Sequence, residues 1–329
     1  MGNPFNPDLF AFDPARSYAW RAFDRVTVAV IAWNRLEMTQ AFFRGLYRTT
    51  HLPVEVLVVD NGSEDATPDY LAALAAAHPE IRVIANRRNI GKPRALLQIQ
   101  QAVTDGLVVM FDNDIELLSN YWLVHVLKAF HAARLRYGTT DFAFGLRLIN
   151  CEEYGFRFAV QQEVLPIPHA ANDLPRTSYA AASKDTPDPS SLLDEQVVIG
   201  WTGHLLGGTG AMPVSVLKQL RLDEMYPKAI GGDDTHVSAE LRRLGVRFGY
   251  IENGPVARHN DWPYTEEKVE LYTALMQQRT VTDLPYLRWK WRDLKRRLIG
   301  ALPGRSPGPR QEASPPGPPP GAKPLDPLK

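Results

Sequence analysis

The feature that most constrains the fold is a regular alternation of strand-like and helix-like segments over residues 26–111. Short runs rich in β-branched residues occupy 26–32, 54–59, 81–85 and 107–111, and helix-like segments occupy 36–47, 67–77 and 92–103. Neighbouring parallel strands need a crossover connection, which is usually a helix, so this order predicts βαβ units. We therefore expect an α/β fold with a mainly parallel central sheet flanked by helices.

Polar side chains follow each of the four predicted strands. The clusters are Trp33-Asn34-Arg35, Asp60-Asn61-Gly62-Ser63, residues 86–92, and Asp112-Asn113-Asp114. In open α/β sheets, ligands bind outside the carboxyl ends of the strands. The sequence thus predicts a ligand site along one edge of the sheet.

The Asp112 and Asp114 carboxylates raise a question of charge. Two like charges one residue apart at the end of a buried strand repel each other and lose hydration. A divalent cation would offset this cost, and Mg²⁺ and Mn²⁺ prefer carboxylate oxygens. A solvated turn, or a cap for the helix expected over 119–136, is the alternative.

Composition excludes several classes of protein. Lys plus Arg and Asp plus Glu number 37 each, so nothing in the overall charge points to nucleic acid. The single cysteine, Cys151, rules out an intramolecular disulfide and fits a reducing compartment. The first residues lack the pattern of a signal peptide, and no apolar run approaches the ~20 residues that span a bilayer. We expect a cytoplasmic protein, free or bound peripherally to the inner face of a membrane.

The second half of the chain is less regular. Strands are expected within 142–165 and at 196–201 and 246–251, and helices at 119–136, 213–220 and 234–244, with a proline-rich loop over 166–195. We expect an N-terminal extension (1–25), one domain (26–282) with halves 26–118 and 119–282, a basic amphipathic helix (283–302) and a disordered proline-rich tail (303–329).

Taken together, the motifs resemble those of family 2 glycosyltransferases, which have the GT-A fold. The segments that carry the resemblance are VAVIAWNR (28–35), VLVVDNGSED (56–65), NRRNIGKPRAL (86–96), VVMFDNDIEL (108–117), the glycines of 203–210, and GGDDTHVSAELRRLG (231–245). The resemblance implies metal-dependent transfer of a sugar, with inversion, from a nucleotide-diphosphate donor to an acceptor hydroxyl. A UDP-sugar donor is favoured, and the expected setting is glycan or cell-surface polysaccharide synthesis. The resemblance assigns 26–118 to the nucleotide sugar and 119–282 to the acceptor.

The resemblance also implies a metal site and a donor site. Asp112 and Asp114 match the family's DxD motif, and His259 is expected as a third ligand to Mn²⁺ or Mg²⁺, although a lone histidine is often structural. The expected donor-binding residues are Ala32, Trp33, Asn34, Arg35, Asp60, Asn89, Gly91, Lys92, Arg94, Asp112 and Asn113.

Several of these donor residues have a second interpretation. Asp60 is expected to accept a hydrogen bond from the nucleobase, but Asp-Asn-Gly is also strong turn chemistry. Trp33 either stacks on the base or is an ordinary buried tryptophan. Lys92 and Arg94 lie at a predicted helix start that favours anions, whereas many family members carry an arginine two residues after the position of Arg94.

The expected catalytic pair is Asp233 and Asp234, which aligns with the family's Glu-Asp. Asp234 is expected as the general base that takes the proton from the acceptor hydroxyl. Capping of the following helix is the alternative, and both roles can hold together. Trp201, Gly207 and Gly208 are the expected acceptor-binding residues.

The expected partners are a nucleotide-sugar donor and a glycan or lipid-linked acceptor, with no nucleic acid. The basic helix at 284–302 carries a narrow apolar stripe and two tryptophans, which suits an anionic membrane surface. Packing of the stripe on the domain or on a second copy stays open.

Two rival functions remain. A sugar-nucleotide nucleotidyltransferase would need a glycine-rich loop after the first strand, where this chain has Ala32-Trp33-Asn34-Arg35. A non-catalytic nucleotide- or carbohydrate-binding homologue would not need both Asp114 and Asp234.

Overall fold

The structure is a computed structural model that describes residues 21–50, 52–149, 159–167, 196–205, 207–225 and 233–260. All of these residues belong to one compact unit, Met1–Gln278. The helix expected at 283–302, the tail at 303–329 and most of the loop expected over 166–195 lie outside the described residues. In the described part, no helix is long and apolar enough to cross a membrane.

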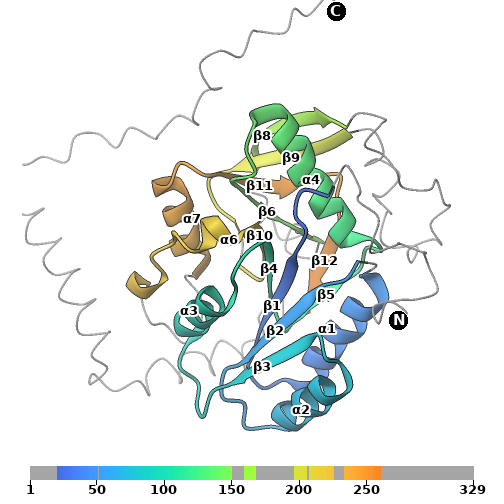
Figure 1. The fold of residues 1–329 in the computed structure, drawn as a ribbon, viewed down its shortest axis with the longest axis vertical. Coiled ribbons are helices and arrows are strands. Elements are labelled where there is room, and N and C mark those ends of the chain that lie inside the picture. The colour runs from blue at the N-terminus through green and yellow to red at the C-terminus, as the bar shows by residue number, and fades with distance from the viewer. Residues whose placement is uncertain are drawn as a thin grey trace, which may run out of the picture. The chain divides into compact units, whose positions relative to one another are not determined.

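Four parallel strands form the first half of the large sheet, in the order β3-β2-β1-β4 (Figure 1). The strands are β1 (Val26–Ala32), β2 (Glu55–Asp60), β3 (Ile81–Ala85) and β4 (Leu107–Asp112), and the helices between them are α1 (Leu36–Thr49), α2 (Thr67–Ala77) and α3 (Lys92–Ala102). Every residue of β1 is buried, because helices cover both faces of the sheet. The predicted βαβ order is confirmed.

The sheet becomes mixed beyond β4 and continues in the order β10-β6-β11-β9-β8, nine strands in all. These strands are β6 (Phe142–Gly145), β8 (Ala159–Pro166), β9 (Gln196–Thr202), β10 (Thr209–Pro213) and β11 (Arg247–Ile251). The remaining helices among the described residues are α4 (Trp122–Tyr137), α6 (Val214–Leu217), the 3₁₀ helix η3 (Leu222–Glu224) and α7 (Asp233–Arg243). The α/β class is confirmed, although the parallel arrangement holds mainly in the first half. A turn at Gly207 and Gly208 leads into β10, which runs antiparallel to β4.

Each face of the sheet packs against its own layer of helices. Val28 and Val30 point into a core shared with α1, α2 and α4. Ala29 and Ile31, on the opposite face of the same strand, point into a core shared with α3, α6 and α7. Figure 1 shows α3, α6 and α7 on the side of the sheet away from α4.

A second, three-stranded sheet has the order β5-β12-β7. Its strands are β5 (Ile115–Leu117), β7 (Arg147–Leu148) and β12 (Val256–His259). β5 starts directly after Asp114, His259 pairs with Ile115, and the Asn260 N–H donates to the Asp114 carbonyl at 2.8 Å. His259 ends β12, which places it beside the segment that follows the aspartates.

Candidate active site

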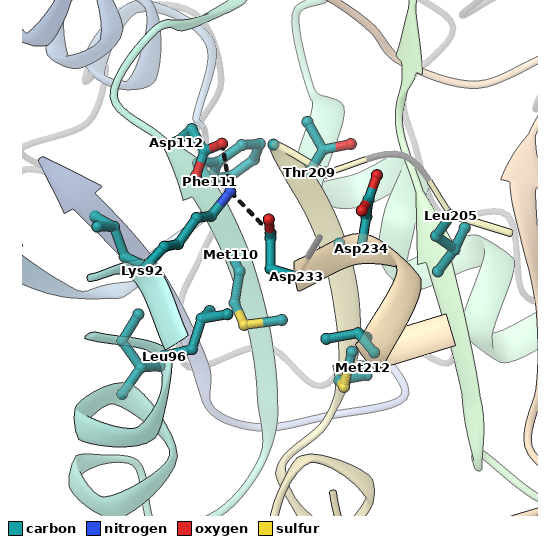
Figure 2. A pocket seen from close by; sticks show the side chains of 16 residues that line it. Lys92, Leu96, Met110, Phe111, Asp112, Leu205, Thr209, Met212, Asp233 and Asp234 are labelled. Carbon is teal, nitrogen blue, oxygen red and sulfur yellow. Dashed lines mark hydrogen bonds and ion pairs between the residues drawn. The ribbon is translucent and has the colours of Figure 1, made fainter. Parts of the chain in front are cut away.

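A pocket lies at the edge of the sheet where β4 ends and β10 begins (Figure 2). The Asp112 N–H donates to the Gly208 carbonyl at 3.1 Å, so the turn before β10 adjoins the end of β4. The pocket has a volume of about 530 Å³, including its open mouth. Its charged lining residues are Lys92, Asp112, Asp233 and Asp234, and apolar side chains that include Leu96, Met110 and Met212 line the rest. The pocket therefore has a charged rim above an apolar floor.

Lys92 joins two of these carboxylates. It comes from the first turn of α3, and its Nζ lies 2.7 Å from Asp112 Oδ2 and 2.9 Å from Asp233 Oδ2, as Figure 2 shows. Burial acts to lower the pKa of Lys92, but the two carboxylates outweigh burial and raise that pKa above its ordinary value. Lys92 therefore stays charged at neutral pH and ties the end of β4 to the start of α7.

Asp112 sits among charges of both signs. Burial raises the pKa of its carboxyl, the Lys92 ammonium acts to lower it, and the negative charges of Asp114 and Asp233 add to the increase. The net effect is a raised pKa. A further positive charge at this position would stabilise the ionised form.

Arg35 holds the other half of the Asp-Asn-Asp segment. Its Nη1 donates to Asp114 Oδ2 at 2.9 Å, and its Nη2 donates to Asn113 Oδ1 at 3.1 Å. Asn34 and Arg35 both have positive φ angles, 53° and 61°. Two adjacent non-glycine residues in this region carry backbone strain, which is typical of functional sites.

Asp234 lies next to Asp233 in the first turn of α7, and its Oδ2 is 3.3 Å from His204 Nε2. Its Oδ1 accepts a hydrogen bond from the Thr235 N–H at 2.7 Å. The helix start and the histidine thus hold the carboxylate from two sides. Gly207 lies beside both aspartates: a Cβ on it would be 3.5 Å from Asp233 Oδ2 and 3.7 Å from Asp234 Cβ.

Two of the three expected metal ligands, Asp112 and His259, lie close to Gly208. This glycine has a φ of +96°, and a Cβ on it would lie 3.7 Å from both Asp112 Oδ2 and His259 Cδ2. Two carboxylates and an imidazole suit Mn²⁺, and the carboxylates suit Mg²⁺. As the side chains stand, no group of three His, Cys, Asp or Glu in the described part of the chain is placed to hold a metal ion. The donor chemistry fits a divalent cation, while Lys92 and Arg35 bind the carboxylate oxygens that it would need.

The far end of the site, after β2, is a network of short polar side chains. Asp60 is buried, and its Oδ1 accepts hydrogen bonds from the Ser63 N–H at 3.0 Å and the Ser63 hydroxyl at 2.6 Å. Asn89 Oδ1 accepts from the Gly91 N–H at 2.8 Å and from the Asn61 side chain at 3.0 Å. The turn interpretation of Asp60 is thus correct for one oxygen, and Oδ2 takes no part in that turn.

Comparison with known proteins identifies the first half of the chain. Residues 27–150 match the family model described as glycosyl transferase family 2. This segment is a family 2 glycosyltransferase domain. The expected family and the assignment of the chain as a glycosyltransferase are confirmed.

One solved structure shows the same fold, and a second is less similar. A mannosyltransferase from Pyrobaculum calidifontis, in complex with GDP-Man and Mn²⁺, is 18% identical, with a TM-score of 0.50 over 85% of this chain and 70% of that one. TarS from S. aureus, in complex with UDP-GlcNAc, is 15% identical, with a TM-score of 0.44 over 84% of this chain and 74% of that one. No curated protein sequence matches the chain.

The fold brings many of the expected residues to one edge of the sheet. The residues that line the pocket or flank its carboxylates are Arg35, Lys92, Asp112, Asp114, Gly207, Gly208, Asp233, Asp234 and His259. Asp60, Asn89 and Gly91 lie in the polar network after β2 and β3. Trp33 and Asn34 follow β1, with Trp33 half-buried, and Arg94 lies half-buried in the first turn of α3.

Three expected ligand contacts need correction. The Trp201 indole is buried on the α4 face of the sheet and donates to Glu163 Oε2 at 2.7 Å, so it does not line the pocket. Ala32 is fully buried, and its carbonyl accepts the Asn61 N–H at 2.8 Å. Asn113 is also buried, and its amide group bonds Arg35 and Thr39. Asn113 therefore holds the loop in place and does not face the donor.

One residue of the site was missed from the sequence as a catalytic candidate. His204 was not among the expected site residues, yet its ring contacts Asp234, the expected base. The signal available was a histidine within a few residues of Gly207 and Gly208. That signal indicates a role for His204 only once the structure shows that the turn lies beside the start of α7.

Proposed function

We propose that this chain is an inverting glycosyltransferase that moves a sugar from a nucleotide-diphosphate donor to an acceptor hydroxyl. The observation that carries the proposal is one pocket with Asp112 and Lys92 on one side and Asp234, held by His204, on the other. One side of such a pocket can bind a charged donor, and the other can accept a proton.

Asp234 is the proposed general base. An acceptor hydroxyl within hydrogen-bond reach of its Oδ2 would lose its proton to the carboxylate as the oxygen attacks the anomeric carbon. His204 shares that oxygen and orients it. A single displacement with the base opposite the leaving diphosphate inverts the anomeric configuration.

Asp112, Asp114 and His259 are the residues that would hold Mn²⁺ or Mg²⁺. When bound, the cation would supply positive charge for the leaving diphosphate. The approach of Asp112 and His259 to Gly208, and the hydrogen bond from the Asn260 N–H to the Asp114 carbonyl, support this assignment.

Asp60 is the proposed reader of the nucleobase. Ser63 occupies its Oδ1, so Oδ2 can accept the N–H of a uracil edge. This geometry supports a UDP-sugar as the favoured donor, with Trp33 beside the base. The proposed acceptor is a glycan or lipid-linked sugar near Gly207 and Gly208, in cell-surface polysaccharide synthesis on the cytoplasmic face of a membrane.

A thermal-shift panel with UDP, GDP, dTDP and CMP, each with Mn²⁺ or with EDTA, tests the donor site. We expect UDP with Mn²⁺ to raise the melting temperature most, because a ligand that binds only the native state stabilises it. In Asp60→Asn, the affinity for UDP should fall by about tenfold or more, since a hydrogen bond to a charged acceptor is lost.

Glu64→Gln is the matched control, because this carboxylate lies in the same loop and is exposed. Wild-type affinity for UDP is expected in that variant. A panel in which no nucleotide shifts the melting of the folded protein would reject the proposed donor site.

A further inference from the structure

The pocket carries more carboxylates than the two that are expected to bind the metal. Asp112, Asp114, Asp233 and Asp234 all lie within it or at its edge. A cluster of carboxylates that is partly removed from water needs nearby positive charge to remain ionised. Lys92 and Arg35 provide that charge through ion pairs of 2.7–2.9 Å.

Lys92 is well placed to act as a counter-ion. Its side chain is 19% exposed, and those of its partners Asp112 and Asp233 are 22% and 11% exposed. Ion pairs shielded from solvent in this way are screened less by salt than surface pairs. The Lys92 pairs are therefore a substantial part of the electrostatic balance of the pocket.

Arg35 plays the same part for the neighbouring carboxylate. The Asp114 side chain is 6% exposed, and the guanidinium of Arg35 spans Asp114 and Asn113. The strained backbone of Asn34 and Arg35 aims this guanidinium at the Asp-Asn-Asp segment. A fork-shaped cation fixed in this way occupies one face of the carboxylate.

The oxygens bound by these cations are Asp112 Oδ2 and Asp114 Oδ2. A divalent cation that uses the same two carboxylates must compete with Lys92 and Arg35 for them. It must also enter a site whose negative charge is already partly neutralised. Both effects weaken binding of the metal alone.

A nucleotide diphosphate changes this balance. It adds phosphate charge that Lys92 and Arg35 can pair with in place of the aspartates. Coupling of this kind is reciprocal, so the diphosphate strengthens binding of the metal as much as the metal strengthens binding of the diphosphate.

Building on the proposed function, we propose that Lys92 and Arg35 are built-in counter-ions that compete with the divalent cation for Asp112 and Asp114. They make metal binding weak by itself and strong only together with the nucleotide diphosphate. Lys92 acts on both sides of the pocket, since it also holds Asp233 beside the proposed base.

Titration of the full chain with Mn²⁺, followed by the electron paramagnetic resonance signal of free Mn²⁺, tests this idea without an activity assay. In Lys92→Met, the affinity for Mn²⁺ alone should rise by about tenfold, because a competing positive charge is removed next to the carboxylates. The gain in Mn²⁺ affinity that UDP produces should shrink by a similar factor.

Two control variants separate this effect from a general change of charge. Lys92→Arg keeps the positive charge and should keep Mn²⁺ binding weak. Arg87→Met removes an exposed cation from the loop before α3 and should leave Mn²⁺ affinity within about twofold of wild type. Equal Mn²⁺ affinities in Lys92→Met and Arg87→Met would overturn the proposal.

If Lys92→Met does not fold, a double variant, Lys92→Met/Asp233→Asn, is compared with Asp233→Asn alone. The double variant removes one positive and one negative charge, so the net charge of the pocket is unchanged from wild type. Tighter Mn²⁺ binding in the double variant supports competition, and equal binding rejects it.

Failure of the counter-ion proposal is distinguishable from failure of the proposed function. Mn²⁺-dependent UDP binding with no effect of Lys92 would reject only the counter-ion role. Tighter Mn²⁺ binding in Lys92→Met, with no nucleotide bound by any variant, would reject only the donor site.

Discussion

His125 shows how a single buried side chain sets the pH range of the fold. It lies in α4 with 1% of its surface exposed, and neither of its ring nitrogens has a hydrogen-bond partner in the described part of the chain. Burial, with a smaller effect of the Lys128 charge, lowers the pKa of His125 to about 3. The ring is therefore neutral in the native state across the physiological range.

This depressed pKa predicts a loss of stability in acid. Above about pH 6.5, the ordinary histidine pKa, the ring is neutral in both the native and the unfolded state. As the pH falls from there toward 3, only the unfolded state takes up the proton, so the free energy of unfolding decreases. The decrease due to His125 should reach at most about 4 kcal/mol near pH 3.

Urea denaturation of wild type and His125→Phe at pH 7 and at pH 4 measures this contribution. Between pH 7 and pH 4, the free energy of unfolding of wild type should fall by about 2–3 kcal/mol more than that of His125→Phe. His236→Gln, which changes a half-buried histidine of α7 whose ring contacts the Arg221 carbonyl, is the control and should show no such shift. Parallel losses in wild type and His125→Phe would show that the His125 ring is not responsible.

At the residue scale, the residues that end the strands could be predicted from the sequence. The face of the sheet that a given side chain occupies could not. Asp60, Asp112 and the Asp233–Asp234 pair stand out in the sequence because carboxylates follow apolar runs or precede a helix. Trp201 was misjudged because which face of β9 it occupies depends on the pairing with β11 and β8. A one-residue difference along a strand moves a side chain to the other face.

At the element scale, the first four strands were predicted to within a residue or two, but β10 was not. Its sequence, TGAMP, has no β-branched run and contains both glycine and proline. It forms a strand because β4 and β6 on either side supply backbone partners. The short strands β5 and β12 were also not predicted, since their pairing joins segments far apart in the chain.

The helix that carries the proposed base is anchored at its far end. Glu240, in α7, has a 6% exposed side chain that accepts hydrogen bonds from the Arg221 guanidinium at 2.7 Å and the Arg243 guanidinium at 2.8 Å. The Arg221 backbone N–H adds a third bond at 3.0 Å. Hydrogen bonds from Arg221 hold the pKa of Glu240 well below its ordinary value, against the effect of burial. The carboxylate therefore stays ionised and fixes α7 to the segment before η3.

Replacement of Glu240 by alanine should destabilise the protein and loosen Asp234 together. We expect a loss of about 2–3 kcal/mol in the free energy of unfolding, because several charge-assisted hydrogen bonds disappear. Turnover should fall more than nucleotide affinity, since α7 begins with the proposed base. Denaturation and steady-state kinetics measure the two effects. The control is Glu224→Ala, which removes an exposed carboxylate near the same arginine. Equal stability of the two variants would contradict the anchoring role.

At the scale of the whole molecule, the pocket is assembled from both halves of the chain. The parallel half supplies Asp112 from β4 and Lys92 from α3, while the mixed half supplies the Gly207–Gly208 turn and α7. The antiparallel pairing of β10 with β4 brings these parts to one edge. The family match ends at residue 150, so the proposed base lies in the part of the chain that the family model does not cover.

The central claim is that Asp234 is the base of a sugar transfer carried out in this pocket. The most direct measurement is turnover of the nucleotide sugar chosen by the binding panel, in wild type and Asp234→Asn, together with calorimetric affinity for the nucleotide. The account predicts that kcat falls by about a hundredfold or more in Asp234→Asn, while nucleotide affinity stays within about threefold of wild type. Turnover that survives in Asp234→Asn would contradict the assignment of the base, and no turnover by wild type with any donor that binds would contradict the function itself.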